Sequence, residues 1–558
     1  MEKFTVYSPW AKSDYLEKRG ITKRLSSLVG KTIGMYSSFK EYHPYFMEEL
    51  ERQMREILPD TEFSHYTYIV DQTDIHTDKI HYADFKEWIS NVDAVVGIGA
   101  DMGSCALYMG YNFAHIESLG VPAVLLAKQQ YITSAQKGAG ARRYPTLRIV
   151  TYDGPGFVPP AVDCKEWTIA TYKEKIADMI PQIIEALTKP LTDEEENPKA
   201  AQDHSEDNFT GSVEEINDWY YSNGWTNGSP IGLPTRENID EMLKGTDLSA
   251  DYVVAELPPM LGKATVEKIA INGILAGCKP TYMPLLIAAV EAMNDDKLYL
   301  EGWTCSNATW MPTAVISGPI RNDIGINTDR NLVSPYTRPQ ACIGKAIAYM
   351  IMNIGGTRSR IEDMSGPGSD GRFGIVLAEN EEESPWDPLQ TDYGYSKDDS
   401  AITLFWPSEH TQIQTVTPSA TLKNLCKVWH GGFDVGIMIV LPPENAKMFA
   451  DKGYSKKDIL EYVKEYNRRP STEIPRAAIG NNHPREGLIF PEEGLEHSAR
   501  LFWNTEHMFL LVGGRDWGQA YLGGGDHGGP VCKKANLPKN WDELIKEYPG
   551  TMPKYLDY

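Results

Sequence analysis

The sequence predicts an α/β protein with an N-terminal doubly wound parallel-sheet domain and a larger α/β or α+β C-terminal domain. The chain has 558 residues, which is too long for one hydrophobic core because cores stop growing near ~300 residues. In the first third of the chain, short apolar runs alternate with amphipathic stretches. An acidic stretch poor in apolar residues follows and separates this region from the rest.

The first domain is expected over residues 1–190. Its apolar runs of strand length are residues 31–37, 63–70, 93–100, 122–127 and 146–152. Stretches with apolar residues at helical spacing lie between or after them, at residues 45–58, 83–92, 106–120 and 172–187. Because strands that alternate with helices form parallel sheets covered on both faces, we expect a flavodoxin-like or Rossmann-like domain.

Residues 191–212 are acidic, contain a proline and have little to bury, so we expect a linker there. The second domain is expected over residues 213–558. It has a long helical pattern at residues 265–293 that Pro280 interrupts, and strand-like runs at 402–407, 435–443 and 507–514. These patterns leave its strand order open, and no internal repeat is evident.

The charge of the chain bears on its partners. The net charge is -23 and the isoelectric point is about 5.0, so the chain repels phosphate backbones and anionic membranes. We therefore expect a small-molecule substrate, no nucleic acid and no membrane; a homo-oligomer is compatible with the composition. We expect no signal peptide, because the first twenty residues lack the apolar stretch of such peptides, and the seven cysteines are scattered without a CxxC pair. This pattern favours a reduced, cytoplasmic chain without structural zinc.

A strand, a glycine-rich turn and a helix are predicted around the sequence GADMGSC. Gly99 and Gly103 allow a tight turn, Ser104 is placed to cap the helix, and Cys105 falls in its first turn. Backbone N–H groups and the helix dipole favour an anion there and lower the pKa of a thiol. In open α/β sheets, ligands bind at this edge. We expect substrate to contact this turn, including Met102, with Cys105 as the nucleophile.

Three interpretations of this turn remain open. Gly97, Gly99 and Gly103 have the spacing Gly-x-Gly-x-x-x-Gly, which is one residue off a dinucleotide fingerprint, so a nucleotide-dependent oxidoreductase is one alternative. A buried structural cysteine would instead indicate a non-catalytic module that binds an anion or small molecule. The third interpretation is a nucleophilic or redox-active Cys105.

The sequence here resembles the UGSC family of selenoproteins and their cysteine relatives, whose signature is selenocysteine-Gly-Ser-Cys after a strand. It is also similar to the selenoprotein B subunits of glycine reductase-type enzymes. The resemblance covers about residues 30–160 and rests on Gly103, Ser104, Cys105, Glu117, Gly120 and Pro122. The second domain looks like the larger partner of such modules, through residues 264–278, 318–327, 353–358 and 377–388.

The chain departs from this family at Met102, which stands where the family has selenocysteine or cysteine. A thioether neither ionises nor forms a selenenyl sulfide with Cys105. The selenol chemistry of the family therefore does not carry over to position 102. Either Cys105 acts without it, or the turn has become a binding site in which Met102 packs against substrate.

Two acidic segments of the second domain are candidates for proton transfer. Glu379 lies in an acidic turn after an apolar run and is suited to bind a cation or act as general base; the alternative is a solvated loop. Asp526 and His527 lie between glycines and offer an acid/base or metal-ligating pair; the alternative is a flexible surface turn. No histidine spacing typical of a metal site is present, so no metal is expected.

Three further residues are candidates for substrate binding. Arg142 and Arg143 follow a predicted strand and suit a substrate carboxylate, although a surface basic pair is an equal alternative. Cys278 ends a helical stretch and would form a redox pair if it faced Cys105; the alternative is a buried helix cysteine.

Together these patterns predict a two-domain enzyme that performs reductive or eliminative cleavage of a carbon–heteroatom bond in a small molecule. Cys105 would attack or protonate the reacting centre, and Glu379, Asp526 or His527 would move the proton. No cofactor is assigned. A reductase of the family type would need an external thiol to regenerate the site.

Overall fold

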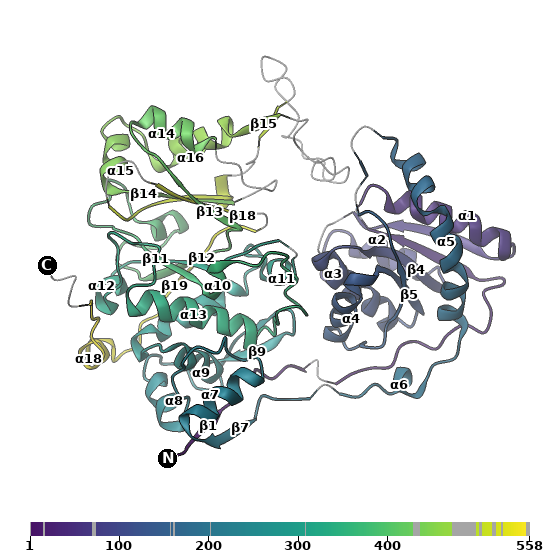
Figure 1. Cartoon of the computed structure of the whole chain (residues 1–558), viewed down its shortest axis with the longest axis horizontal. Coiled ribbons are helices and arrows are strands. Elements are labelled where there is room, and N and C mark those ends of the chain that lie inside the picture. Colours follow the sequence, from purple (N-terminus) through teal and green to yellow (C-terminus); the bar gives the residue numbers. More distant parts are fainter. Residues whose placement is uncertain are drawn as a thin grey trace.

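The computed structural model describes residues 2–14, 17–38, 40–69, 74–156, 158–159, 162–200, 202–306, 308–427, 436–470, 498–500, 505–515, 520–525 and 528–553. Figure 1 shows two parts connected by extended segments. The smaller, called the first part, is built from residues before about 190. The larger, called the second part, holds most of the remaining chain.

The first part contains a five-stranded parallel sheet, as the sequence predicts. Its strands are β2 (Thr32–Ser37), β3 (Glu62–Thr67), β4 (Ala94–Ala100), β5 (Ala123–Lys128) and β6 (Arg148–Tyr152). Their order is β3-β2-β4-β5-β6, and every neighbouring pair is parallel. β4 and β5 are buried along their whole length, which explains their continuous apolar sequences.

Helices cover both faces of this sheet (Figure 1). The helices on one face are α1 (His43–Ile57) and α5 (Cys164–Thr188), and those on the other are α2 (Tyr82–Ile89), α3 (Gly103–Ser118) and α4 (Ile132–Ala141). Their apolar side chains form one core on each side of the sheet. This part of the chain is therefore a mixed α/β structure.

The chain reverses its direction across the sheet between β2 and β4. From β2 it passes through α1 to the edge strand β3, and then through α2 to β4 on the other side of β2. α1 and α3 then leave the ends of neighbouring strands on opposite faces of the sheet. Such a reversal opens a crevice at the carboxyl ends of the two strands. Residues 40–43 and 101–105 follow these two strands, at the carboxyl end of the sheet.

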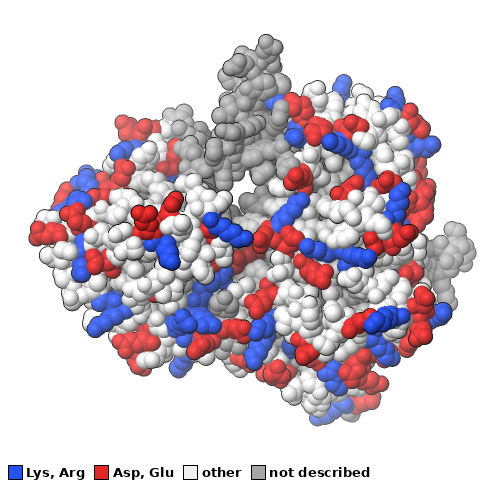
Figure 2. Space-filling model, turned by 180° about the vertical axis from the view of Figure 1, so that it is seen from behind, with Lys and Arg blue, Asp and Glu red and all other residues white. Residues whose placement is uncertain are grey.

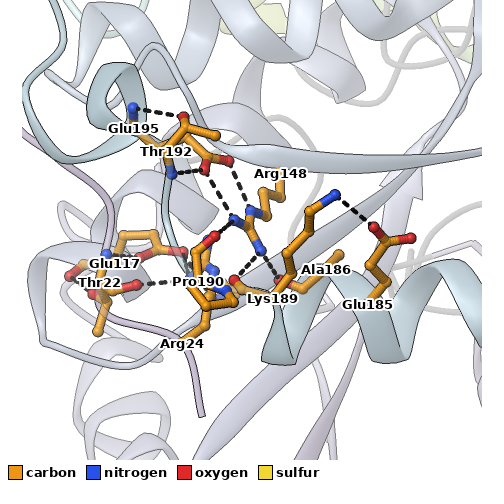
Figure 3. A network of polar contacts seen from close by, with 11 residues as sticks. Thr22, Arg24, Glu117, Arg148, Glu185, Ala186, Lys189, Pro190, Thr192 and Glu195 are labelled. Atoms are coloured by element: carbon orange, nitrogen blue, oxygen red, sulfur yellow. Dashed lines mark hydrogen bonds and ion pairs between the residues drawn. The ribbon is translucent and has the colours of Figure 1, made fainter. Parts of the chain in front are cut away.

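Glu117 fixes the far end of α3, as Figure 3 shows. Its buried carboxylate accepts hydrogen bonds from the Arg24 guanidinium at 2.8 Å and from the backbone N–H groups of Thr22 and Ala123 at 2.6 and 2.9 Å. Gly120 adopts a left-handed backbone with φ 81°, which lets the chain turn from α3 into β5. Residues 117–122 match the Glu-x-x-Gly-x-Pro pattern of the resembling family. They therefore have a structural role, at the edge of the sheet opposite Cys105.

The first strand of the chain lies in the second part. β1 (Phe4–Tyr7) pairs antiparallel with β7 (Asn208–Gly211), and Val6 is buried in the core of the second part. The predicted domain over residues 1–190 thus contains a strand that packs elsewhere. Its partner lies some 200 residues away in the sequence, and local patterns carry no information about such a pairing.

The segment predicted to be a linker contains regular structure. It includes β7 and the short helix α6 (Asp193–Glu196), which Thr192 caps. It runs beside the other connection between the two parts (Figure 1), and the N–H of Ile21 donates to the carbonyl of Glu195 at 3.1 Å. Contacts with a segment far away in the sequence stabilise regular structure here, although the acidic composition predicts a linker.

The second part contains two four-stranded sheets with the same arrangement. One has the order β11-β10-β12-β19, from β10 (Thr313–Ser317), β11 (Ile375–Ala378), β12 (Ala401–Phe405) and β19 (Val531–Lys534). The other has the order β17-β14-β18-β13, from β14 (Gly436–Leu441), β17 (Met508–Val512), β18 (Ala520–Gly525) and β13 (Glu409–Ile413). In each, a parallel pair is followed by two antiparallel strands.

This arrangement is a duplicated unit whose last strands are exchanged. In the first unit, α12 (Ile320–Ile324) and α13 (Arg338–Asn353) connect β10 to β11, and β12 and β13 follow. In the second, α15 (Pro443–Ala450) and α16 (Lys456–Tyr466) connect β14 to β17, and β18 and β19 follow. β13 joins the sheet of the second unit and β19 that of the first. The sequence itself shows no repeat.

Further helices complete the second part. They are α7 (Val213–Ser222), α8 (Arg236–Leu243), α9 (Val266–Ala276), α10 (Met283–Met293), α11 (Leu300–Thr304), α14 (Pro418–Leu425) and α18 (Trp541–Glu547). Two hairpins are β8 (Val253–Leu257) with β9 (Gly262–Thr265), and β15 (Arg468–Pro470) with β16 (Ser498–Arg500). The break predicted at Pro280 is confirmed, since it separates α9 from α10.

The surface carries acidic and basic side chains close together. Figure 2 shows them interspersed over the face seen from behind. The net charge of -23 is therefore not gathered in one patch on that face. None of the described helices is both long and apolar enough to cross a bilayer.

Candidate functional site

The turn from β4 to α3 lies at the crevice, where the sequence analysis expects the site. β4 ends at Ala100 and α3 begins at Gly103. Met102 is the N-cap residue, and its carbonyl accepts a hydrogen bond from the N–H of Ala106 at 2.8 Å. The prediction that Ser104 caps the helix is wrong: Ser104 is buried inside the first turn, because the helix begins one residue before it.

Gly97 and Gly99 serve close packing of the helix, and not the tight backbone turn that the sequence predicts. A Cβ atom on Gly99 would lie 2.7 Å from the Met109 sulfur, and one on Gly97 would lie 2.6 Å from the Phe113 ring. Neither glycine has a positive φ. They therefore allow α3 to pack closely against β4, whereas a sharp turn of the backbone does not require them here.

Cys105 lies in the first turn of α3, at the positive end of the helix dipole, as predicted. Its side chain is buried, and the residue is 5% exposed. Burial raises the pKa of the Tyr152 phenol at the end of β6 well above its usual value, and the nearby Asp101 and Cys105 raise it further. Cys105 thus lies close to Tyr152 and to the acidic residue described next.

Asp101 is the centre of a buried polar network that spans the crevice. Its carboxylate accepts hydrogen bonds from the Lys40 ammonium at 2.5 Å and the Tyr42 hydroxyl at 2.7 Å. The His43 Nε2 lies 3.3 Å from the same carboxylate, and the His43 Nδ1 lies 2.7 Å from the Ser38 hydroxyl. The segment after β2 therefore meets the turn after β4 through side chains at hydrogen-bond distance.

Burial and neighbouring charges shift the pKa values of Asp101 and His43 in this network. Burial alone would raise the pKa of Asp101, but the Lys40 ammonium and His43 lower it to well below its usual range. Burial lowers the pKa of His43, which makes it neutral near pH 7. Asp101 and Lys40 are consequently an ion pair inside the protein, and its hydrogen bonds offset the cost of burying both charges.

Lys128 adds a positive charge at the end of β5. It is a buried residue, and its pKa is lowered by burial and raised in part by Asp101. Within the described residues it forms no ion pair. Lys40 and Lys128 together outnumber the single carboxylate of Asp101. An excess of one buried positive charge favours a thiolate or a bound anion at this edge.

Sequence reasoning missed Lys40, His43 and Asp101, although Asp101 stands within the GADMGSC motif. A usable signal was present in the segment SSFKEYH, which follows the first apolar run just as ADMGSC follows the third. Neighbouring parallel strands bring their carboxyl ends to the same edge. Polar residues after both runs were therefore candidates for one site.

The same helix contacts the second part. The hydroxyls of Tyr108 and Tyr111 donate to the two carboxylate oxygens of Glu301 in α11, the former at 3.2 Å. Both tyrosines belong to one apolar cluster with Cys305. Burial raises the pKa of Glu301, while the Arg142 guanidinium lowers it in part. The helix that carries Cys105 thus takes part in the contact between the two parts.

Arg142 and Arg143 do not form one carboxylate-binding pair. The Arg142 guanidinium stacks over the Tyr111 ring at 3.8 Å, and its Nε lies 3.0 Å from the Asp74 carboxylate. The Arg143 Nη2 donates instead to the carbonyl of Asp14 at 3.1 Å. Arg142 belongs to the contact between the parts, and Arg143 to the connecting segment.

Cys278 lies beside another thiol than Cys105. It follows α9 and packs on the core of the second part. Its neighbour Gly277 lies against Cys342 of α13, whose sulfur is 3.3 Å from the position of a Cβ there. Burial raises the pKa of the Cys278 thiol well above its usual value, and Cys342 raises it further. The expected redox pair with Cys105 is therefore not formed.

Glu379 is fully buried in the second part, away from Cys105. One oxygen accepts a hydrogen bond from the N–H of Leu389 at 2.7 Å, and the other has no partner among the described residues. Burial raises the pKa of Glu379 to about 7. Carboxylates of residues 381–383 pair with Arg321 and Arg515, so the acidic loop is largely neutralised.

Asp526 and His527 lie outside the described residues, so their place relative to Cys105 is left as predicted. In the part of the chain that the structure describes, no three His, Cys, Asp or Glu side chains are grouped to hold a metal ion.

A comparison with family models supports the resemblance of the first part. The UGSC family model matches residues 5–189, which is about a third of the chain. The matched region contains the parallel sheet, the turn with Cys105 and the network around Asp101. No curated protein matches the chain.

Proposed function

We propose that this protein is a cysteine-dependent enzyme that acts on a small anionic molecule at the crevice between β2 and β4, with Cys105 as the reacting thiol. The observation that carries the proposal is the excess of buried positive charge from Lys40 and Lys128 over Asp101, at the edge where α3 begins. This charge and the helix dipole both stabilise a thiolate and an incoming anion.

The reaction class that fits best is cleavage of a carbon–heteroatom bond. The Cys105 thiolate attacks carbon, a C–S bond forms, and the heteroatom leaves with the bonding electrons and takes up a proton. In the reductive case two external thiols release the product and restore Cys105. The balance is then R–X + 2 R′SH → R–H + HX + R′S–SR′. The Tyr42 hydroxyl and His43 are nearer to this edge than Glu379 and are better suited to move the proton.

A non-catalytic anion-binding module is the second candidate. The observation that favours it is the low exposure of Cys105, which is 5%. Lys40, Lys128 and the start of α3 would bind the same anions without any reaction. Met102 is then a packing residue at the mouth of the site.

The experiment follows the Cys105 thiol and the release of a leaving group. We expect iodoacetamide to label Cys105 in the folded protein with an apparent pKa below the ~8.5 of a free thiol. Lys128→Met should raise that pKa by about one unit, since it removes a neighbouring positive charge. Small carboxylates that carry a halide, amine or thioether should release it in the presence of dithiothreitol.

Cys105→Ser should lower that release at least about hundredfold, because a hydroxyl is a much weaker nucleophile than a thiolate. Cys532→Ser is the matched control, as it removes a buried thiol in β19, and should leave release unchanged. Labelling of Cys105 only upon unfolding, with anion binding retained, would support the binding module instead.

A further inference from the structure

A cleft on the second part lies between α10, the segment before β8 and the segment after β19. It has a volume of about 190 Å³. Three of its lining residues, Leu248, Tyr252 and Leu537, are 39%, 51% and 39% exposed although they are large and apolar. Side chains of this kind at a single cleft mark a surface that is suited to an apolar ligand.

A carboxylate without a partner also lines this cleft. Glu291 of α10 is half-buried and, among the described residues, forms neither a hydrogen bond nor an ion pair. Burial raises its pKa, and Lys533 lowers it only in part. A carboxylate that has lost part of its hydration without gaining a donor is under-solvated, so a cation that reaches it is favoured.

The other charges around the cleft do not supply that cation. The Lys534 ammonium lies 2.5 Å from Asp399, and the Lys533 ammonium lies 2.8 Å from Asp295. At the rim, the Asp247 carboxylate has two long contacts with the exposed Lys539, at 3.8 Å from its ammonium and 3.5 Å from its backbone N–H. The bases are thus already paired, and the cleft as a whole is negative.

We propose that this cleft binds a small organic cation, in which an ammonium group is carried on an apolar body and Glu291 is its counter-ion. The ammonium group contacts the Glu291 carboxylate, and the apolar body lies against Leu248 and Leu537. The exposed Tyr252 ring adds a cation–π contact. This site is separate from the crevice of Cys105, so its failure would leave the proposed function unaffected.

The test uses the full chain and benzylammonium chloride, with benzyl alcohol as the neutral probe of similar shape. Titration calorimetry at pH 8 and low salt should show saturable binding of benzylammonium, at least about tenfold tighter than that of benzyl alcohol, because only the cation pairs with Glu291. Glu291→Gln should weaken benzylammonium binding by about tenfold or more and leave benzyl alcohol unchanged. Tyr252→Leu should weaken it about two- to fivefold.

Glu237→Gln is the matched control, since Glu237 is an exposed glutamate of α8 outside the cleft, and it should leave binding unchanged. Binding should also weaken as the pH falls and Glu291 takes up a proton. Absence of saturable benzylammonium binding, equal affinity for benzyl alcohol, or unchanged affinity in Glu291→Gln would each overturn the proposal. Circular dichroism should first show that Glu291→Gln and Glu237→Gln are folded, so that their affinities can be compared.

Discussion

Two buried carboxyl groups behave in opposite ways because their neighbours differ. Asp101 receives hydrogen bonds from Lys40 and Tyr42, and its pKa lies well below the usual range. For Glu379, burial outweighs the attraction of Lys456, and its pKa rises to about 7. The partner of a buried acid, rather than burial itself, therefore decides whether it is charged at neutral pH.

Glu379→Gln should stabilise the protein above neutral pH. The unfolded carboxyl titrates near ~4.3, so between that pH and about 7 the folded chain binds a proton that the unfolded chain does not. Stability contributed by Glu379 is therefore lost as the pH rises through this window. We expect the variant to gain about 1–3 kcal/mol in free energy of unfolding at pH 8 and almost nothing at pH 4.

Urea denaturation at both pH values measures this difference, with Glu237→Gln as an exposed control that should gain nothing at either. Equal stability of Glu379→Gln and the unmodified chain at pH 8 would contradict an elevated pKa for Glu379.

The sequence predicted the position of Cys105 but not the residues around it. A strand–turn–helix is a local pattern, so the sequence GADMGSC was enough to predict that Cys105 lies in the first turn of a helix. Lys40 reaches Asp101 because β2 and β4 pair in parallel with Ser37 opposite Ile98. That register is a tertiary property, and no local pattern in the sequence reveals it, because Lys40 and Asp101 are separated by 61 positions.

α3 and α4 approach each other through glycines. A Cβ on Gly110 of α3 would lie 2.2 Å from the carbonyl oxygen of Ala135, and one on Gly138 of α4 would lie 2.2 Å from that of Leu107. Only glycine permits backbones to pack this closely. The helical spacing of α3 was predicted from the sequence, whereas α4 and its contact with α3 were not.

Gly110→Ala should therefore force the two helices apart. We expect a loss of about 1–3 kcal/mol in the free energy of unfolding of the first part, because the Ala135 carbonyl is backbone and cannot rotate away. Gly140→Ala in α4 is the matched control: its Cβ would have ordinary contacts, the nearest at 3.7 Å. That change should be neutral or stabilise by up to about 1 kcal/mol. Thermal unfolding of both variants checks the contrast, which equal losses would refute.

The second part is built from two units that share strands. β19 pairs with β12 in one sheet, yet in the chain it continues from β18 of the other. The strand-like runs at 402–407, 435–443 and 507–514 are confirmed as strands, but their order depends on which sheet the last strand joins. No local sequence pattern shows whether a strand pairs within the sheet of its own unit or within the sheet of the other unit.

This exchange should couple the stability of the two sheets. Val531 of β19 is buried opposite Leu404, and Val531→Ala should cost about 2 kcal/mol. Hydrogen exchange followed by mass spectrometry should become faster in β10 and β14 by similar factors. Ile183→Ala in α5, which packs on the other part of the molecule, should leave both strands unchanged. Faster exchange in β10 alone would mean that the sheets open independently.

Because β1 pairs with β7, the polypeptide leaves the second part and returns to it, and everything between is inserted within one continuous host. Two connections restrict rotation of the inserted body more than one would, and the contacts of Tyr108 and Tyr111 with Glu301 restrict it further. Removal of this body, with a short bridge between residues 13 and 203, would leave the first edge strand attached to the host that it completes.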